Sequence, residues 1–216
     1  PIRAEDTEGV LDLARSLDVE LVVVGPEAPL VAGLADALRG LGIPVFGPGH
    51  RAAAIEGSKS FAKEIMEAAG VRTASQLSSA NPPCVIKADG LAAGKGVFVC
   101  RTQPDVDAAL RALERSDAPF LVEELLEGPE VSVFAVCDGR SALPLVPAQD
   151  FKRALDGDEG PNTGGMGSYA PVPGVGEDVL DELVSEIHRP VLAELEARGR
   201  PFVGLLYAGL MLTEDG

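Results

Sequence analysis

Apolar residues in the first fifty positions alternate between a helical spacing and short continuous runs. A helix is predicted where apolar residues recur with the period of a helix, at Val10, Leu11, Leu13, Ala14 and Leu17. The continuous apolar run at 21–24 predicts a strand, and the pattern repeats as a helix over 30–41 and a strand over 43–46. This alternation indicates part of an open α/β domain with a parallel sheet over residues 1–57.

A second unit is predicted to begin with a helix that Ser58 caps and that ends at Gly70. A polar linker over 75–83 follows it. The linker leads into a strand, a glycine-rich hairpin, a helix and a further strand, with the regular elements at 84–88, 104–115 and 120–125. These elements predict a small α+β lobe over about 71–127.

From residue 128 onward the pattern is that of an antiparallel sheet, with predicted strands at 130–136, 141–146 and 202–213. A helix over 177–198 precedes the last strand, and Pro190 within it predicts a kink or a split. We therefore expect a second domain over 58–216 that contains the small lobe and a larger α+β part.

Charge narrows the classes of partner that the chain can bind. The 216 residues are 46% hydrophobic, which supports a proper core, and 18 basic against 34 acidic residues give a net charge of −16. Such a charge argues against a general nucleic-acid or anionic-membrane surface. Any phosphate site must therefore depend on a local group of basic residues and not on the charge of the whole chain.

The three cysteines, Cys84, Cys100 and Cys137, lack metal-ligand spacing and lie in apolar runs. Buried free thiols in a reducing cytoplasm are the simplest interpretation. No apolar run reaches the roughly 20 residues of a membrane span, and no signal peptide is recognised.

The stretch "IKADGLAAGKGVFVC", residues 86–100, resembles a Walker A loop without matching one. Asp89 stands where the first glycine belongs, Gly96 stands where the hydroxyl residue belongs, and the following residues are typical of a strand. The loop is therefore predicted to join strand to strand as a flap over phosphates, although an ordinary mobile surface hairpin is equally consistent with this segment alone. The candidates for phosphate contact are Lys87, Gly90, Gly94, Lys95 and Gly96.

Two further segments carry candidate ligand-binding residues. Gly25, Pro26 and Glu27 follow the first strand, where open α/β sheets bind ligands, although a plain strand-to-helix turn is the stronger local interpretation. Glu123, Glu124 and Glu130 lie where the small lobe meets the larger sheet. Such a hinge can bind adenine through its backbone and ribose through a carboxylate, and a solvated acidic turn is the alternative.

A polar segment with glycines follows the predicted sheet strands. In "QDFKR", Lys152 and Arg153 can neutralise charge that develops during phosphoryl transfer, and Asp150 lies beside them. The loop "GPNTGGMGSY" suggests a backbone nest for a carboxylate or phosphate, or else a flexible loop, at Asn162, Thr163, Gly164, Gly165, Met166 and Gly167. Lys59 alone is typical of a solvated lysine, and neither His50 nor His188 is assigned a role.

Several motifs occur together and in order: "VGPEAPL", "EGSK", "VIKADGLAAGKGV", "VEELLEGPEVS", "QDFKR", "GPNTGGMGSY" and "LLYAGLM". In these motifs the chain resembles the glycinamide ribonucleotide synthetases, which are ATP-grasp ligases of purine biosynthesis. The resemblance implies an ATP-grasp fold, two α+β lobes that grip ATP, preceded by part of a parallel-sheet α/β domain. It also implies use of ATP with Mg²⁺ or Mn²⁺ in the cytoplasm, with glycine and 5-phosphoribosylamine as substrates.

The resemblance also assigns roles to residues. It implies that Lys59 and Lys87 bind the nucleotide phosphates under the flap, that 123–126, including Leu126, forms the adenine hinge, and that Glu130 binds ribose. The resemblance further implies that the loop at Glu27 forms part of the phosphoribosylamine pocket. The residues expected near glycine and the transferred phosphate are Asp150, Lys152, Arg153 and 162–167.

Members of the family have a glycine-rich loop ahead of the part that matches Pro1, and an "EFN" strand with the metal ligands after the part that matches Gly216. We therefore expect the metal ligands beyond this chain, and we expect residues 1–216 alone to be inactive and poorly soluble. Three alternatives are a nucleotide-binding module without chemistry, a P-loop-like NTPase, which Asp89, Gly96 and the strand after the loop already argue against, and a different ATP-grasp ligase. The segment 160–167 argues against the last of these.

Overall fold

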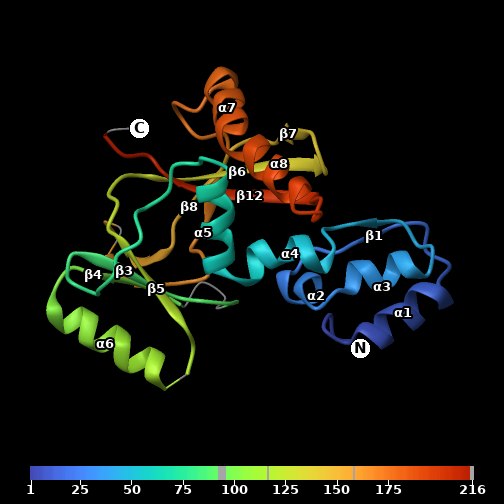
Figure 1. The fold of residues 1–216 in the computed structure, drawn as a ribbon, viewed down its shortest axis with the longest axis horizontal. Helices are drawn as coiled ribbons and strands as arrows, with labels where there is room; N and C mark the ends of the chain where they lie inside the picture. The colour runs from blue at the N-terminus through green and yellow to red at the C-terminus, as the bar shows by residue number, and fades with distance from the viewer. Residues whose placement is uncertain (92–95, 116, 158, 215–216) are drawn as a thin grey trace.

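The computed structural model describes residues 1–91, 96–115, 117–157 and 159–214, without the side chains of Arg153, Glu159, Pro161 and Asn162. Figure 1 shows three parts: an N-terminal unit at one end, a small lobe at the other, and a larger sheet with its helices between and above them. Helix α5 (Lys59–Ala68) runs through the centre of this arrangement.

The N-terminal unit has a parallel pair of short strands, as the sequence predicts, with Val22 opposite Val45. Its elements are α1 (Thr7–Ser16), β1 (Val22–Val23), α2 (Glu27–Val31), α3 (Leu34–Gly40), β2 (Val45–Phe46) and α4 (His50–Gly57). The single helix predicted over 30–41 is wrong, because Gly33 adopts a φ of 93° and divides it into α2 and α3. Leu11, Leu34 and Leu38 form the centre of this unit's core.

The small lobe is an antiparallel sheet with one helix on its face. Its elements are β3 (Cys84–Ala88), β4 (Val97–Cys100), α6 (Gln103–Glu114) and β5 (Phe120–Glu124), in the strand order β4-β3-β5. Alternate residues of the strands, among them Ile86 and Val122, are buried with Val106 of α6. The opposite face of this sheet is therefore left for α5 and for the candidate site.

The larger part contains the antiparallel sheet β12-β6-β7, formed by β6 (Glu130–Asp138), β7 (Ala142–Pro144) and β12 (Val203–Met211). A helical layer of α7 (Glu177–Leu183), η1 (Val184–His188) and α8 (Arg189–Ala197) packs on it, with Leu192 and Leu195 in the core. Two short ribbons lie between β7 and α7, and both were missed from the sequence: β8 (Gln149–Asp150) with β11 (Ser168–Tyr169), and β9 (Arg153–Leu155) with β10 (Glu159–Asn162).

The split predicted at Pro190 takes the form of a π-helical turn. In η1 the Arg189 N–H donates to the Val184 carbonyl, five residues earlier, and α8 then begins with Pro190 in its first turn. A proline ring has no N–H to donate and collides with the carbonyl four residues before it, which a widened turn avoids. The helix therefore continues, with a local change of pitch, up to Ala197.

Glycines allow two close approaches between parts that are distant in sequence. A Cβ at Gly128, just before β6, would lie 2.0 Å from the Leu212 carbonyl oxygen after β12. A Cβ at Gly204 in β12 would lie 2.8 Å from Pro48 of the N-terminal unit. The backbone before β6 therefore packs against backbone after β12, and the Gly204 backbone packs against the Pro48 ring of the N-terminal unit.

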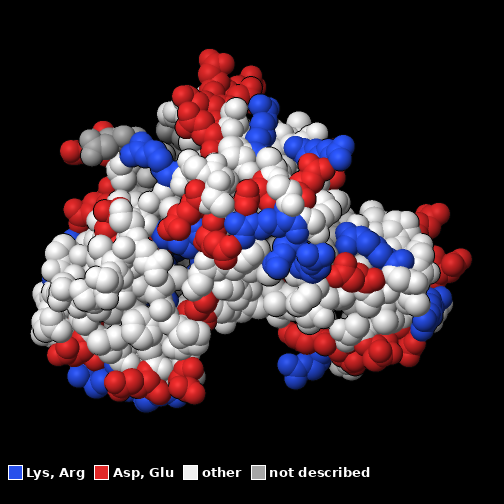
Figure 2. All heavy atoms as spheres, viewed as in Figure 1, with Lys and Arg blue, Asp and Glu red and all other residues white. Residues whose placement is uncertain are grey.

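Positive charge is concentrated locally on this acidic chain. Figure 2 shows Lys and Arg gathered near the junction of the N-terminal unit with the rest, where Arg39, Arg51 and Arg200 line a hollow of about 460 Å³. Acidic residues are prominent on the outer edges of the same view. No helix in the described part of the chain is long and apolar enough to cross a membrane.

Candidate functional site

The glycine-rich segment after β3 is the root of a β-hairpin, as predicted. β3 and β4 are antiparallel, with Lys87 opposite Val97, and the Ala88 N–H donates to the Gly96 carbonyl at 2.7 Å. A strand therefore follows the glycines where a Walker loop would have a helix. Two of the predicted phosphate contacts, Gly94 and Lys95, lie outside the described residues.

The Asp89 carboxylate ties the root of this hairpin to the start of α5. It accepts hydrogen bonds from the Lys59 N–H at 2.6 Å, from the Ser60 N–H at 3.4 Å and from the Ser58 hydroxyl at 3.2 Å. Burial alone would raise the pKa of Asp89, but hydrogen bonds from Ser60, Gly90 and Lys59 together lower it. From sequence, Asp89 served only to exclude a Walker loop, and its link across the lobes was missed.

Lys59 and Lys87 converge beneath the hairpin, as the prediction of two cations at a flap requires. The Lys59 ammonium donates to the Gly90 carbonyl at 2.8 Å. Burial is the largest cause that lowers the pKa of Lys59; Asp89 opposes it, and the nearby charge of Lys87 adds to it. Two neighbouring cations form a local site suited to an anion.

Lys87 and Glu123 come from adjacent strands of the small lobe. Val85 lies directly opposite Glu123, so Lys87, two residues further along β3, is on the same face as Glu123 and diagonal to it. The two side chains form an ion pair, and Glu123 also pairs with Lys63 of α5 at 2.6 Å. Lys63 was missed from the sequence, because a lysine on a helix face resembles a solvated residue.

The hinge residue Glu124 is held by the linker that enters the small lobe. The Ser75 N–H donates to Glu124 Oε1 at 2.7 Å, and the Glu124 N–H donates to the Ser75 carbonyl at 3.0 Å. These contacts from Ser75 lower the pKa of Glu124. Because the side chains of Glu123 and Glu124 and the Glu124 N–H are all engaged, the backbone after Glu124, up to the half-buried Leu126, is the part suited to bind a base.

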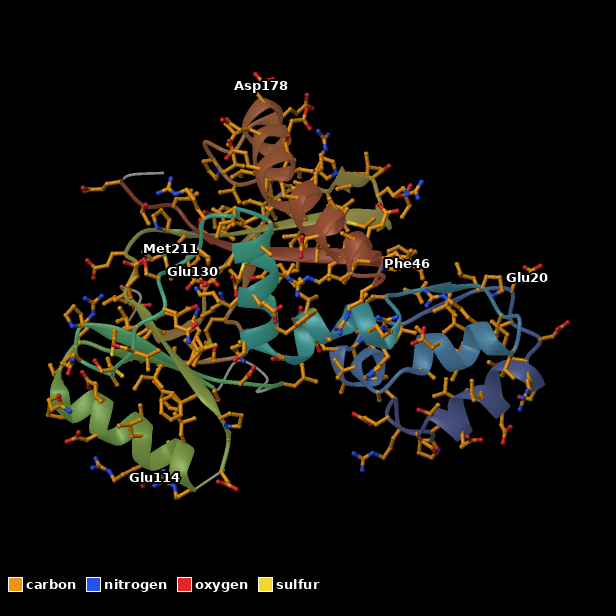
Figure 3. The ribbon with its side chains drawn as sticks, in the orientation of Figure 1. Glu20, Phe46, Glu114, Glu130, Asp178 and Met211 are labelled. Carbon is orange, nitrogen blue, oxygen red and sulfur yellow. The ribbon has the colours of Figure 1, made fainter. Side chains whose placement is uncertain are left out.

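Glu130 lies at the start of β6, opposite Met211, and Figure 3 shows both between the two lobes. Its carboxylate is paired with Lys152, whose Nζ is also 3.8 Å from Asp150. Burial alone would lower the pKa of Lys152, but Glu130 and Asp150 raise it overall. The structure therefore brings Glu130, Asp150 and Lys152 together, whereas the Arg153 side chain lies outside the described residues.

The predicted backbone nest at 162–167 is partly occupied by the chain itself. The Thr163 N–H donates to the Lys152 carbonyl at 2.7 Å, and the Met166 N–H donates to the Phe151 carbonyl at 2.7 Å. The Gly165 N–H donates to the Thr163 hydroxyl at 3.1 Å. These bonds hold the loop on the segment that contains Lys152, so an anion would have to use the other amides or replace these bonds.

Gly25 and Pro26 follow the carboxyl end of β1, as predicted, and Glu27 is the first residue of α2. Glu56 of α4 is partly exposed, but the protein around its carboxyl group and the nearby Glu27 raise its pKa, against the effect of Lys59. Glu27 and Lys59 are therefore both near Glu56.

The remaining candidates are structural. His50 Nδ1 lies 2.5 Å from the Val31 carbonyl, which joins α4 to α2. Among the described residues, no three His, Cys, Asp or Glu side chains converge as a metal site. Cys84, Cys100 and Cys137 are all buried and free, as predicted.

Family profiles match the chain from end to end. The N domain of phosphoribosylglycinamide synthetase matches residues 1–56, and the ATP-grasp (A) domain of the same family matches residues 57–216. The chain belongs to the phosphoribosylglycinamide synthetase family.

Relatives in this family carry a consistent name. The phosphoribosylamine–glycine ligase of Streptomyces coelicolor is 55% identical over 227 residues, which cover 100% of this chain and 54% of that protein. The crystal structure of the phosphoribosylamine–glycine ligase of Thermotoga maritima matches with a TM-score of 0.76 and 33% identity, over 93% of this chain and 54% of that one. This chain thus spans about half the length of the phosphoribosylglycinamide synthetases that it matches.

A more distant structure confirms the predicted fold class. The ADP complex of N5-carboxyaminoimidazole ribonucleotide synthetase matches with a TM-score of 0.72 and 19% identity, over 100% of this chain and 55% of that one. At this identity the likeness shows the fold alone, which is the ATP-grasp fold expected of a phosphoribosylglycinamide synthetase.

Proposed function

We propose that the protein that contains this chain is an ATP-dependent ligase that joins glycine to 5-phosphoribosylamine in purine biosynthesis. The products are glycinamide ribonucleotide, ADP and phosphate. The observation that carries the proposal is the convergence of Lys59 and Lys87 at the root of a glycine-rich β-hairpin, next to a hinge, in a member of this family.

The chain's own residues suit the nucleotide part of this reaction. Lys59, Lys87 and the hairpin amides bind phosphates, and the hinge backbone after Glu124, up to Leu126, binds the base. Glu130 accepts hydrogen bonds from ribose hydroxyls, and for this it leaves Lys152. Lys152 is then free to neutralise charge on the transferred phosphoryl group.

The chemical step needs no protein nucleophile. The glycine carboxylate oxygen attacks the γ-phosphorus of ATP, ADP leaves, and a glycyl phosphate forms. The amine of phosphoribosylamine then attacks the glycyl carbonyl, a proton leaves the nitrogen, and phosphate departs. Arg153, Lys152, Asp150 and the loop 162–167 position glycine and this phosphate, while Gly25, Pro26 and Glu27 belong to the phosphoribosylamine pocket.

Mg²⁺ or Mn²⁺ neutralises phosphate charge when ATP is bound to enzymes of this type. The described residues do not form a site with three metal ligands, and Asp150 and Glu130 share Lys152 as their cation. We therefore assign no step to the metal, and its ligands beyond Gly216 stay a prediction.

The organisation of the chain is part of the proposal. Residues 1–57 form the N-terminal α/β domain, residues 58–216 the ATP-grasp domain, and about 71–127 its small lobe. The partners are the small-molecule substrates rather than nucleic acid or a membrane, because the net charge is −16. Three buried free thiols support a cytoplasmic location.

Substrate-dependent turnover of ATP tests the function. The protein at its full natural length, with Mg²⁺, should release phosphate from ATP only when glycine and phosphoribosylamine are both present. Lys87→Ala should mainly raise KM for ATP, and Arg153→Ala should mainly lower kcat. Equal turnover with other amino acids, or none with glycine, would exclude the assignment and leave a nucleotide-binding module.

A further inference from the structure

Lys63, Glu123 and Lys87 form a buried triad that links α5 to the small lobe. The side chains of Lys63 and Glu123 are 5% and 7% exposed, and that of Lys87 is 32% exposed. Glu123 contacts both ammonium groups, one on each oxygen. A single buried carboxylate therefore serves two cations.

The two lysines are held very differently. Lys63 donates to Glu123 at 2.6 Å, to the Thr73 hydroxyl at 3.2 Å and to the Ala74 carbonyl, so all three of its N–H donors have acceptors. For the Lys87 ammonium group, Glu123 is the one ion-pair partner among the described residues, and no hydrogen bond to another of them is found. Lys63 is therefore fixed, and Lys87 is the member able to turn toward a ligand.

We propose that Lys63 is a positioning residue that lets Lys87 leave Glu123 for a nucleotide phosphate. With Lys63 in place, Glu123 keeps a counter-ion when Lys87 moves. Without Lys63, Lys87 becomes the sole partner of a buried carboxylate, and its removal would leave that charge unpaired, which is strongly unfavourable. The inference rests on the proposed role of Lys87 in binding ATP.

Lys63 could act by neutralising Glu123 or only by joining α5 to the small lobe, and a double variant distinguishes these two roles. If Lys63 acts by neutralising Glu123, removing the Glu123 charge should make Lys63 dispensable for nucleotide binding. If Lys63 only joins α5 to the small lobe, removing Glu123 should add a second defect. The sign of the coupling between the two substitutions therefore separates the two roles.

The test measures the Kd for ATP by calorimetry, together with Tm, on the full-length protein and its variants. Lys63→Met should weaken ATP binding by about tenfold or more, since a buried carboxylate would then hold Lys87. The double variant Lys63→Met/Glu123→Gln should regain most of the ATP affinity that Lys63→Met loses, since no charge remains to hold Lys87. Thr73→Val is the matched control, because it removes another partner of Lys63 without altering any charge, and it should leave Kd unchanged.

Equal or greater loss of affinity in the double variant than in Lys63→Met would overturn the inference, and so would an unchanged Kd in folded Lys63→Met. If Lys63→Met does not fold, Lys63→Gln decides, because it keeps a polar group near Thr73 and Ala74 but carries no charge: it should bind ATP about tenfold more weakly than wild type, and an unchanged Kd would count against the proposal. A wild-type protein that binds no ATP would instead exclude the proposed function on which the inference rests.

Discussion

Asp89 is the residue through which the hairpin root and the start of α5 hold each other. Asp89→Asn keeps the size of the side chain but removes the charge that strengthens bonds to Lys59, Ser60 and Ser58. We expect the free energy of unfolding to fall by about 1–3 kcal/mol, measured by urea denaturation. Asp181→Asn, at an exposed position of α7, is the control and should change it by less than about 0.5 kcal/mol.

The same variant should alter the response to acid. Because the folded pKa of Asp89 is lowered, its contribution is present above the unfolded pKa of about 3.9 and is lost as pH falls through the folded value. Wild type should therefore lose stability more steeply than Asp89→Asn on the acid side. If the stability of the two proteins depended on pH in the same way, the stabilising role of the Asp89 charge would be contradicted.

The site residues that sequence revealed are those with an unusual local pattern. Lys87 was found because glycines follow it, and Glu130 because it lies at the change from one sheet to the next. Lys63 and Asp89 were not found as site residues, since each gains its role from a partner that is distant in the chain: Glu123 for Lys63, and Lys59 for Asp89. A single sequence carries no sign of such long-range pairs.

At the scale of elements, η1 contains a buried histidine. Neither ring nitrogen of His188 has a hydrogen-bond partner among the described residues. Burial lowers the pKa of His188, and this outweighs the opposing effect of backbone groups of Leu206 and Val133. The folded protein therefore favours the neutral imidazole ring of His188.

We expect this histidine to make stability depend on pH. Because the folded pKa is lowered, the contribution is present above the unfolded pKa of about 6.5 and is lost as pH falls below it. His188→Phe removes this dependence, so Tm of wild type should fall more than Tm of the variant between about pH 6.5 and pH 5. His50→Phe is the comparison, because His50 is more exposed; equal slopes for wild type and His188→Phe would refute the prediction.

The approach of Gly128 to Leu212 fixes the connection from the hinge to β6. Gly128→Ala would place Cβ 2.0 Å from a backbone oxygen, at a φ of 154°, so the connection must shift. We expect a loss of about 2–4 kcal/mol in the free energy of unfolding, measured by thermal denaturation. Gly40→Ala, which meets no atom within 4 Å, should be close to neutral; the same small effect at Gly128 would show that the connection yields easily.

Strands with a clear apolar pattern were predicted well, and short ribbons were not. β3 has the predicted bounds, because Cys84–Ala88 is apolar enough to be buried on the α6 side. β8 and β11 have two residues each and no apolar pattern, so backbone pairing alone defines them. The break between α2 and α3 depends on the backbone conformation of Gly33, which apolar periodicity does not report.

At the scale of the whole molecule, the residues of the proposed nucleotide site come from both lobes: Lys87 and Glu123 from the small lobe, and Glu130 and Lys152 from the larger part. A ligand that contacts both lobes should stabilise the folded protein, by about 2.7 kcal/mol at a hundred times its Kd. ADP with Mg²⁺ should therefore raise Tm in differential scanning fluorimetry. Lys87→Ala should reduce this shift at the same ADP concentration, whereas Asp181→Asn should not; an equal shift in all three proteins would place the nucleotide elsewhere.

The general architecture could be predicted from the sequence, but the relative placement of its parts could not. The motifs indicated an ATP-grasp fold, and the comparisons confirm it. The contact of Gly204 with Pro48 joins the N-terminal unit to β12 through bare backbone. Because this contact needs only that Gly204 has no side chain, the local sequence pattern does not predict it.

The order of strands in the larger sheet also bears on how the chain is made. The small lobe can complete its sheet once Glu124 has emerged from the ribosome, whereas β6 pairs along its full length with β12, from Val203 opposite Asp138 to Met211 opposite Glu130. During synthesis, the middle strand β6 therefore has one unpaired edge until β12, the strand after α8, has been made. We expect nascent chains that end before Val203 to hold a folded small lobe beside an unfinished sheet, and this is the interval in which a chaperone would be most needed.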